Sequence, residues 1–166
     1  MSEFITIPLS KTGKYAGMYE AIIDEVDKDL ALISWHVHII TDSHIYAVRA
    51  NGRGKNAQLH RIILERKLER KLLSSEHVDH INHNSLDARR QNLRLASHSQ
   101  NMMNRKMQSN NKTGYRGVYK EGTRYRAQIH ANNKKITLGT FDTPEKAYAA
   151  YCEAAIKYHG EFANLT

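Results

Sequence analysis

The first third of the chain is predicted to form short β-strands joined by turns. Residues 32–40 are rich in β-branched and aromatic side chains, which is typical of a strand, and residues 45–48 form a second candidate strand. Asn51-Gly52 follows and favours a turn. We therefore assign residues 1–58 to a small β-rich N-terminal region.

The next segment, residues 59–73, has a helical pattern. Leu59, Ile62 and Ile63 fall three and four positions apart, which predicts one apolar helix face. The outer face is highly charged, and two interpretations of that charge stay open. It could be a solvated helix face, or a face turned toward phosphate groups.

The end of the chain combines strand periodicity with a helix. In residues 125–130 and 135–138, apolar side chains alternate with polar or basic ones on either side of a tight turn. This predicts a hairpin with one apolar face and one polar, basic face. Thr143 and Gly160 are suited to begin and end a helix, and the alanines between them would let it lie close on the apolar face.

A linker is predicted before this last unit. Residues 108–114 read Gln-Ser-Asn-Asn-Lys-Thr-Gly, a polar run that ends in glycine. The chain is therefore predicted to be an α+β protein. Its β-rich region spans residues 1–58, a central domain spans 59–107, and a C-terminal domain spans 115–166.

Charge adds a preference for a polyanionic partner. The 166 residues carry a net charge of +8. Residues 49–71 hold 8 basic and 2 acidic side chains, residues 105–166 hold 11 and 5, and the segment between them is neutral. Two basic blocks around a neutral, His- and Asn-rich segment suit a catalytic centre set between phosphate-binding surfaces. A protein that is basic for other reasons is the alternative.

Several classes of protein are disfavoured by what the sequence lacks. Cys152 is the single cysteine, so an intrachain disulfide and a cysteine-based zinc site are excluded. No apolar run has the length of a membrane span. Glu3 and Lys11 interrupt any N-terminal signal pattern. We expect a cytosolic protein without a membrane partner.

Candidate chemistry lies in the neutral segment, where Asp79 and His80 precede a series of asparagines. Hydrolysis of a phosphodiester needs a base, a cation at the phosphate, and a group that holds the base. Histidine suits the first task because its pKa lies near neutrality, and oxygen ligands suit a hard cation such as Mg²⁺. Neighbouring residues of a strand face opposite sides, so on a strand one of the Asp79 and His80 side chains could reach a metal while the other faces the substrate. Ser97 and Gln100 form a capping-box pattern for a helix that carries Asn101.

This segment resembles the HNH endonucleases, specifically the phage and intron-homing group, through residues 78–94. The resemblance implies a β-hairpin and a helix around one divalent metal ion, Mg²⁺ or Mn²⁺, with Asp79 and Asn101 as its ligands. It further implies His80 as the general base and Asn92, on the return strand, as the residue that orients it. The residues implied to hold the loop and approach the DNA backbone are Asp87, Arg89 and Arg90.

Other histidines receive no catalytic role. His36 and His38 would share one face of a strand, but no suitably spaced carboxylate lies beside them, so a metal site there is disfavoured. His77 and His83 are expected around the site or on the surface. His60 lies in an upstream segment that fits the same family pattern, and we expect it to be buried and hydrogen-bonded beside the site.

The C-terminal residues 113–166 resemble the AP2 DNA-binding domain. The matching stretches are residues 114–118, 125–129, 138–141 and 147–151. The resemblance implies a three-stranded antiparallel sheet, packed on one helix, whose polar face reads the major groove of double-stranded DNA. Tyr119, Glu121 and Thr137 depart from the family pattern, so the base preference of its members is not transferred. The implied DNA-contacting residues are Arg116, Tyr119, Arg124, Arg126, Gln128, His130, Lys135 and Thr137.

Alternation along the strands agrees with these positions except at Arg116, whose role comes from the resemblance alone. Two functions are compatible with the sequence. One is an endonuclease of homing or phage type, in the cytoplasm of a bacterial or phage-infected cell. The other is a non-catalytic, sequence-specific DNA-binding regulator on a degenerate HNH scaffold. An RNase is disfavoured because A-form RNA closes its major groove to such a sheet. One active site per chain favours nicking by a monomer, whereas a dimer could cut both strands.

Overall fold

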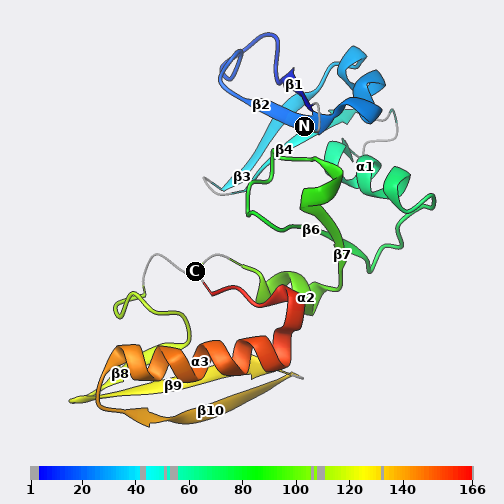
Figure 1. The fold of residues 1–166 in the computed structure, drawn as a ribbon. Coiled ribbons are helices and arrows are strands. Elements are labelled where there is room, and N and C mark those ends of the chain that lie inside the picture. The colour runs from blue at the N-terminus through cyan, green and yellow to red at the C-terminus, as the bar shows by residue number, and fades with distance from the viewer. Residues whose placement is uncertain are drawn as a thin grey trace. The chain divides into compact units, whose positions relative to one another are not determined.

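The computed structural model describes residues 4–41, 44–50, 52, 56–105, 107, 111–131 and 133–165. The fold is α+β, with several small sheets and few helices (Figure 1). The chain forms two compact units, residues 1–98 and 99–166. No helix within the described ranges is long and apolar enough to span a membrane.

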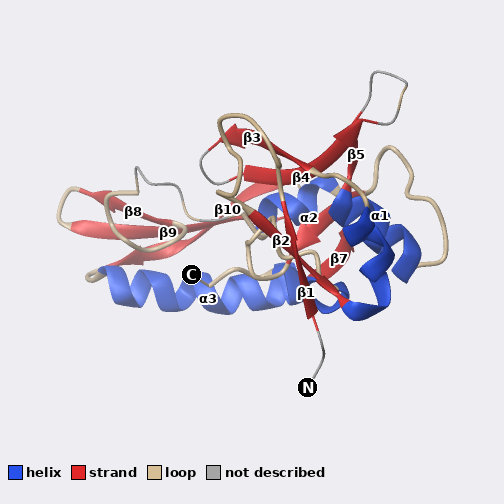
Figure 2. Ribbon diagram, turned by 90° about the horizontal axis from the view of Figure 1, so that it is seen from above, coloured by secondary structure: helices blue, strands red, loops and turns tan. Residues whose placement is uncertain are grey.

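Among its described residues, the first unit forms three small antiparallel sheets. One pairs β1 (Phe4–Pro8) with β2 (Glu20–Asp24), and a second has the order β3-β4-β5 (Figure 2). The third pairs β6 with β7. The remaining strands are β3 (His36–Thr41), β4 (His44–Ala50), β5 (Asn56–Gln58), β6 (His77–His80) and β7 (Leu93–Ala96). The helices of this unit are η1 (Glu25–Leu32), α1 (Leu59–Lys67) and η2 (Arg90–Asn92), where η marks a 3-10 helix.

One hydrophobic core joins the N-terminal strands to the HNH-like segment. Trp35 is 1% exposed and packs in the same cluster as Ile63 of α1 and Leu93 of β7. The Trp35 Nε1 donates to the Leu30 carbonyl at 2.8 Å, which satisfies its buried N–H. The sequence had separated residues 1–58 from 59–107, and in the structure side chains from both ranges share this core.

The helix expected over residues 59–73 is shorter and ends at Lys67. Glu69 has a positive φ of 53°, which breaks the helical path. The guanidinium of Arg61 then donates to the carbonyls of Leu72 and Leu73, each at 2.9 Å. These bonds bring the chain back along α1, so the charged residues after Lys67 form a loop.

The second unit is a three-stranded antiparallel sheet with the order β10-β9-β8, covered on one face by α3 (Figure 1). The expected hairpin and helix are present. Thr143 Oγ1 accepts from the Lys146 N–H at 3.3 Å and so caps α3. Ala147 and Ala155 are buried against the sheet. The elements of this unit are α2 (His98–Met103), which begins at the last residue of the first unit, β8 (Val118–Glu121), β9 (Arg124–Ala131), β10 (Lys134–Phe141), α3 (Pro144–His159) and η3 (Gly160–Phe162).

The predicted linker lies partly outside the described residues, since 108–110 are not among them. Its second half is a turn built on Asn111. The Asn111 Oδ1 accepts from the backbone N–H groups of Thr113 at 2.9 Å and Gly114 at 3.1 Å, and its Nδ2 donates to the Tyr115 carbonyl at 2.9 Å. Such an Asx-type arrangement fixes the entry into the sheet.

Gly117 is expected to be indispensable for the second unit. Its φ is +69°, and a Cβ built there would lie 2.2 Å from the Tyr151 ring and 2.6 Å from the Gln128 carbonyl. We predict that Gly117→Ala lowers the free energy of unfolding by about 2–5 kcal/mol, from left-handed strain and overpacking together. Gly122 also has a positive φ but open space around it, so Gly122→Ala should cost only about 1 kcal/mol. Urea unfolding followed by circular dichroism measures both, and equal losses would contradict the steric argument.

Candidate active site

The candidate catalytic pair lies at the end of a two-stranded hairpin. In the antiparallel register, Asp79 is opposite Arg94 and His80 is opposite Leu93. The Asp79 side chain is buried, and its Oδ2 accepts from Arg94 Nε at 2.7 Å. Because β6 alternates, the carboxylate and the imidazole leave the strand on opposite sides.

Asn92 closes the loop that follows His80. Its Oδ1 accepts from the Asn82 N–H at 2.9 Å, and its Nδ2 donates to the Asp87 carbonyl at 2.7 Å. Its own carbonyl accepts from the Ile81 N–H at 3.0 Å. Asn92 is 6% exposed and lies in η2, just before the return strand on which the sequence had placed it. These bonds fix the backbone directly after His80.

A second buried carboxylate, Asp87, organises the same loop. It accepts from Arg89 Nε at 2.8 Å and Nη2 at 2.6 Å, and from Asn82 Nδ2 at 2.8 Å. Burial by itself would raise the pKa of Asp87, but the hydrogen bonds from Arg89 and Asn82 outweigh it and lower that pKa. The loop is further tied to β2, because the Ile22 N–H donates to the Leu86 carbonyl at 2.8 Å. The expected loop-holding role of Asp87 and Arg89 is thus visible in these contacts.

Asp27 is a structural residue that the sequence reasoning missed. It is 0% exposed and accepts from Arg90 Nε at 2.8 Å and from Arg66 Nη1 at 3.2 Å. The Asp24 carboxylate also accepts from the Arg90 backbone N–H at 2.6 Å. The sequence signal for the pairing with Arg66 is the stretch of residues 1–48, with 7 acidic and 3 basic side chains, followed by the basic block of residues 49–71.

His80 lies in a row of aromatic rings. Its ring centroid is 5.1 Å from that of His60 in a T-shaped contact, and His60 is 5.1 Å from Tyr46. Burial lowers the pKa of His80 to about 4, against the opposing attraction of Asp79 and Asp87. Its imidazole is therefore neutral at pH 7, the form that can accept a proton. His60 is buried as expected, and burial together with the charges of His80 and Arg61 holds its pKa well below the ordinary value.

The two predicted metal ligands belong to different units of the chain. Asp79 lies on β6, whereas Asn101 lies on α2 within residues 99–166 and is partly buried. In the part of the chain that the structure describes, no three His, Cys, Asp or Glu side chains gather as a metal cluster. The predicted ligands are one carboxylate, Asp79, and one amide, Asn101, so they are not expected to appear as a cluster of this kind. Magnesium is commonly held by one or two carboxylates plus substrate phosphate, and Asp79 can supply one such carboxylate.

Most of the predicted DNA-contacting residues share the sheet face opposite α3. Across the strands, Arg126 is paired with Tyr119, Gln128 with Thr137, and His130 with Lys135. Arg126 also forms an ion pair with Glu121. Arg124 Nη2 lies 3.5 Å from Asp142 Oδ1. Arg116 precedes β8, and its guanidinium donates to the Arg105 carbonyl.

Thr140 joins this face and was missed by simple alternation. A bulge between Thr137 and Gly139 shifts the register of β10, so that Thr140 lies opposite Arg126. Without the bulge, Gly139 would have taken the polar side. The glycine in a strand was the available signal, since an isolated strand glycine often marks a bulge.

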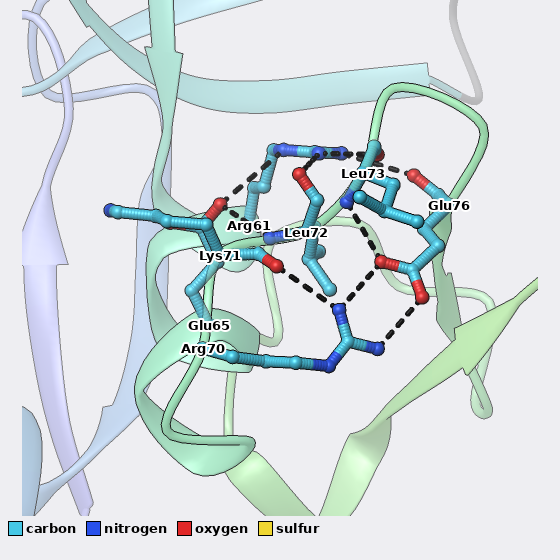
Figure 3. Close-up of polar contacts among 7 residues, drawn as sticks. All are labelled: Arg61, Glu65, Arg70, Lys71, Leu72, Leu73 and Glu76. Atoms are coloured by element: carbon cyan, nitrogen blue, oxygen red, sulfur yellow. Dashed lines mark hydrogen bonds and ion pairs between the residues drawn. The ribbon is translucent and has the colours of Figure 1, made fainter.

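The charges of α1 and the loop after it are used within the protein (Figure 3). Arg70 donates two bonds to the Glu76 carboxylate, at 2.7 and 2.8 Å, and Lys71 pairs with Glu65 at 2.8 Å. Arg66 is held by Asp29, with two bonds of 2.7 Å. Neither of the two open interpretations of this charged segment included such internal pairing.

Comparison with known proteins identifies the middle of the chain. Residues 57–103 match the family model of an HNH endonuclease. An uncharacterized HNH endonuclease of Acanthamoeba polyphaga mimivirus is 39% identical over 106 residues, which cover 64% of this chain and 55% of that protein. The chain thus matches about half the length of this relative. No solved structure matches the chain. The HNH resemblance is confirmed at the level of the domain, and the AP2 resemblance stays a prediction.

The Glu76 ion pair predicts a pH-dependent contribution to stability. The Arg70 hydrogen bonds, helped by the Leu73 N–H, lower the pKa of Glu76 to about 2, below its ordinary 4.5. A depressed pKa stabilises the fold above about pH 4.5, and this contribution is lost as the pH falls toward about 2. Glu76→Gln should therefore be less stable than wild type at pH 7, and the difference in urea midpoint should shrink between pH 5 and pH 2.

Glu69→Gln is the matched control for this measurement. Glu69 lies in the same loop and makes no ion pair within the described residues. The urea midpoint of Glu69→Gln should therefore differ little from that of the wild type at every pH. A Glu76→Gln difference that stays constant in acid would contradict the role of the ion pair.

Proposed function

We propose that this chain is a metal-dependent DNA endonuclease. Its active site for phosphodiester hydrolysis contains Asp79 and His80. The observation that carries the proposal is the position of this pair at the end of β6, inside the residues that match the HNH endonuclease family. The His80 imidazole is neutral at pH 7, so it is in the form that can take up the proton of a water molecule.

The residues of the site divide the work. His80 accepts the proton of the attacking water. Asn92 keeps the loop after His80 in place through its bonds to Asn82 and Asp87. Asp79 and Asn101 would hold a divalent cation, Mg²⁺ or Mn²⁺. Such a cation, when bound, stabilises charge on the phosphate and on the leaving oxygen.

Target binding is assigned to the second unit. Its sheet presents a polar, basic face opposite α3, and a sheet face of this width can enter the major groove of double-stranded DNA. Arg89 and Arg90 are proposed to lie near the DNA backbone beside the site. A monomer of homing or phage type that nicks DNA is the form of the proposal most consistent with one site per chain.

Supercoiled plasmid provides the direct test. Incubation with Mg²⁺ or Mn²⁺ should give nicked circles, and EDTA should abolish them. Binding of the plasmid without any metal-dependent nicking would instead support the non-catalytic regulator.

His80→Ala is predicted to lower the cleavage rate by about 10²–10⁴-fold, because a general base contributes that much. DNA binding and folding should stay near wild type, and added metal should not restore cleavage. Asp79→Ala should also stop cleavage, but through weaker metal binding, so high Mn²⁺ should restore part of it. Plasmid nicking across a metal titration measures each rate.

Two neighbouring histidines serve as controls. His77 packs against the His98 ring at 5.5 Å, and His83 lies in the loop with a φ of 60°. His77→Ala and His83→Ala should both cleave at close to the wild-type rate. If His83→Ala lost cleavage while His80→Ala remained fully active, the general base would have been assigned to the wrong histidine of the motif.

Arg126 is predicted to read a base. If it contacts guanine through two hydrogen bonds, Arg126→Ala should remove about 1–3 kcal/mol of preference at one position of the site. A binding-site selection on the cleavage-deficient His80→Ala background measures this, and unchanged sequence preference would exclude base reading. Glu121→Gln releases Arg126 from its ion pair and should strengthen binding. The control Glu153→Gln changes the charge equally on α3, away from the sheet face, and should bind more weakly than Glu121→Gln.

A further inference from the structure

Three rings from three different elements form a continuous row that ends at His80. Tyr46 comes from β4, His60 from the first turn of α1, and His80 from the last position of β6. The Tyr46 and His60 centroids are 5.1 Å apart with the planes tilted by 50°, and the His60 and His80 centroids are 5.1 Å apart with the planes at 73°. Both separations fall within the range of favourable aromatic pairs, in which geometry is specific.

A histidine at position 60 is costly for the core alone. It is 6% exposed and sits on α1 between Leu59 and Ile63, which are 1% and 0% exposed. Burying a polar ring there costs free energy that an apolar side chain of similar size would not cost. The His60 ring makes an edge-to-face contact with His80 that a leucine at this position would not supply.

The backbone on either side of His80 is held by hydrogen bonds. The register with Leu93 fixes the strand, and Asn92 fixes the loop after it through backbone contacts to residues 81, 82 and 87. These bonds locate the Cα of His80, and the contact with the His60 ring acts on the side chain beyond it. The T-shaped contact with His60 constrains the plane of the ring itself.

We propose that His60 is the positioning residue of the general base: its ring, backed by Tyr46, holds the His80 imidazole in the orientation that accepts a proton from water. This proposal rests on the proposed endonuclease function. His60 touches neither metal nor DNA in this role and acts through His80. Burial keeps the pKa of His60 well below its ordinary value, so the supporting ring stays neutral and does not repel His80 when that residue takes up the proton.

The test compares a replacement that keeps a ring with one that removes it. His60→Leu fills the site without a ring and should lower kcat for nicking by about 10–100-fold with little change in KM, because a misplaced catalytic group can cost about 10²-fold. His60→Phe keeps an aromatic surface against His80 and should recover most of that loss. Urea unfolding of each full-length variant separates these effects from loss of stability.

A spectroscopic measurement tests the orientation without relying on cleavage. The ¹³Cβ resonance of His80, whose shift follows its side-chain torsion more than the ring current of a neighbour, is identified as the one missing from the His80→Ala spectrum. It should move in His60→Leu and return toward its wild-type position in His60→Phe. Tyr46→Leu keeps His60 but removes its backing, and it should move the resonance by a smaller amount. This variant also keeps the proposal testable if His60→Leu does not fold.

His36→Ala is the control, because it removes an exposed histidine from β3, outside the row of rings, and should change neither kcat nor the His80 resonance. Wild-type kcat and an unmoved resonance in His60→Leu would overturn the proposal. Equal impairment of His60→Leu and His60→Phe, in proportion to lost stability, would also overturn it by making His60 a packing residue. If wild type does not cleave, the endonuclease assignment fails, while the resonance still decides whether His60 orients His80.

Discussion

The buried carboxylate of Asp27 connects the N-terminal region to the catalytic loop. It has no exposed surface and is paired with Arg90 at the start of η2 and Arg66 of α1. A buried charge is tolerated only when such partners are in place, and loss of one partner leaves the other uncompensated. Since Arg90 is two residues before Asn92, this ion pair network anchors the end of the loop that follows His80. The N-terminal region is therefore part of the support of the candidate active site.

Pairing of basic side chains within the protein also bears on where DNA binding is expected. In the first unit, many of the basic side chains of α1 and of the catalytic loop hold carboxylates or carbonyls of the protein itself. Exposed cations paired in this way offer less to a phosphate than their number suggests. The sheet of the second unit places Arg126, His130 and Lys135 on the face opposite α3, and Arg126 is paired there with Glu121. This arrangement supports the proposed division of labour between a site that cuts and a sheet that binds.

The rings of Tyr46, His60 and His80 connect the N-terminal strands with the segment that carries the proposed catalytic residues. Each ring comes from a different element, and His60 and His80 are far apart in the sequence. The contact with the buried His60 ring restricts the orientation of the His80 ring. The proposed catalytic pair of Asp79 and His80 thus depends on the core that the preceding residues build.

Local patterns in the sequence determined a large part of this protein. The hairpin and capped helix of residues 124–159 and the buried face of α1 follow from periodicity and capping chemistry, which act between near neighbours. The strand carrying Asp79 and His80 was implied by the resemblance of its motif to the HNH endonucleases. What the sequence could not determine were contacts between distant residues. Pairing of Asp27 with Arg90, the early end of α1 and the side of Thr140 at the bulge each depend on partners that only the tertiary structure brings together. Sequence spacing limits which residues are adjacent along one element, whereas burial and charge pairing across elements are decided by the packed chain as a whole.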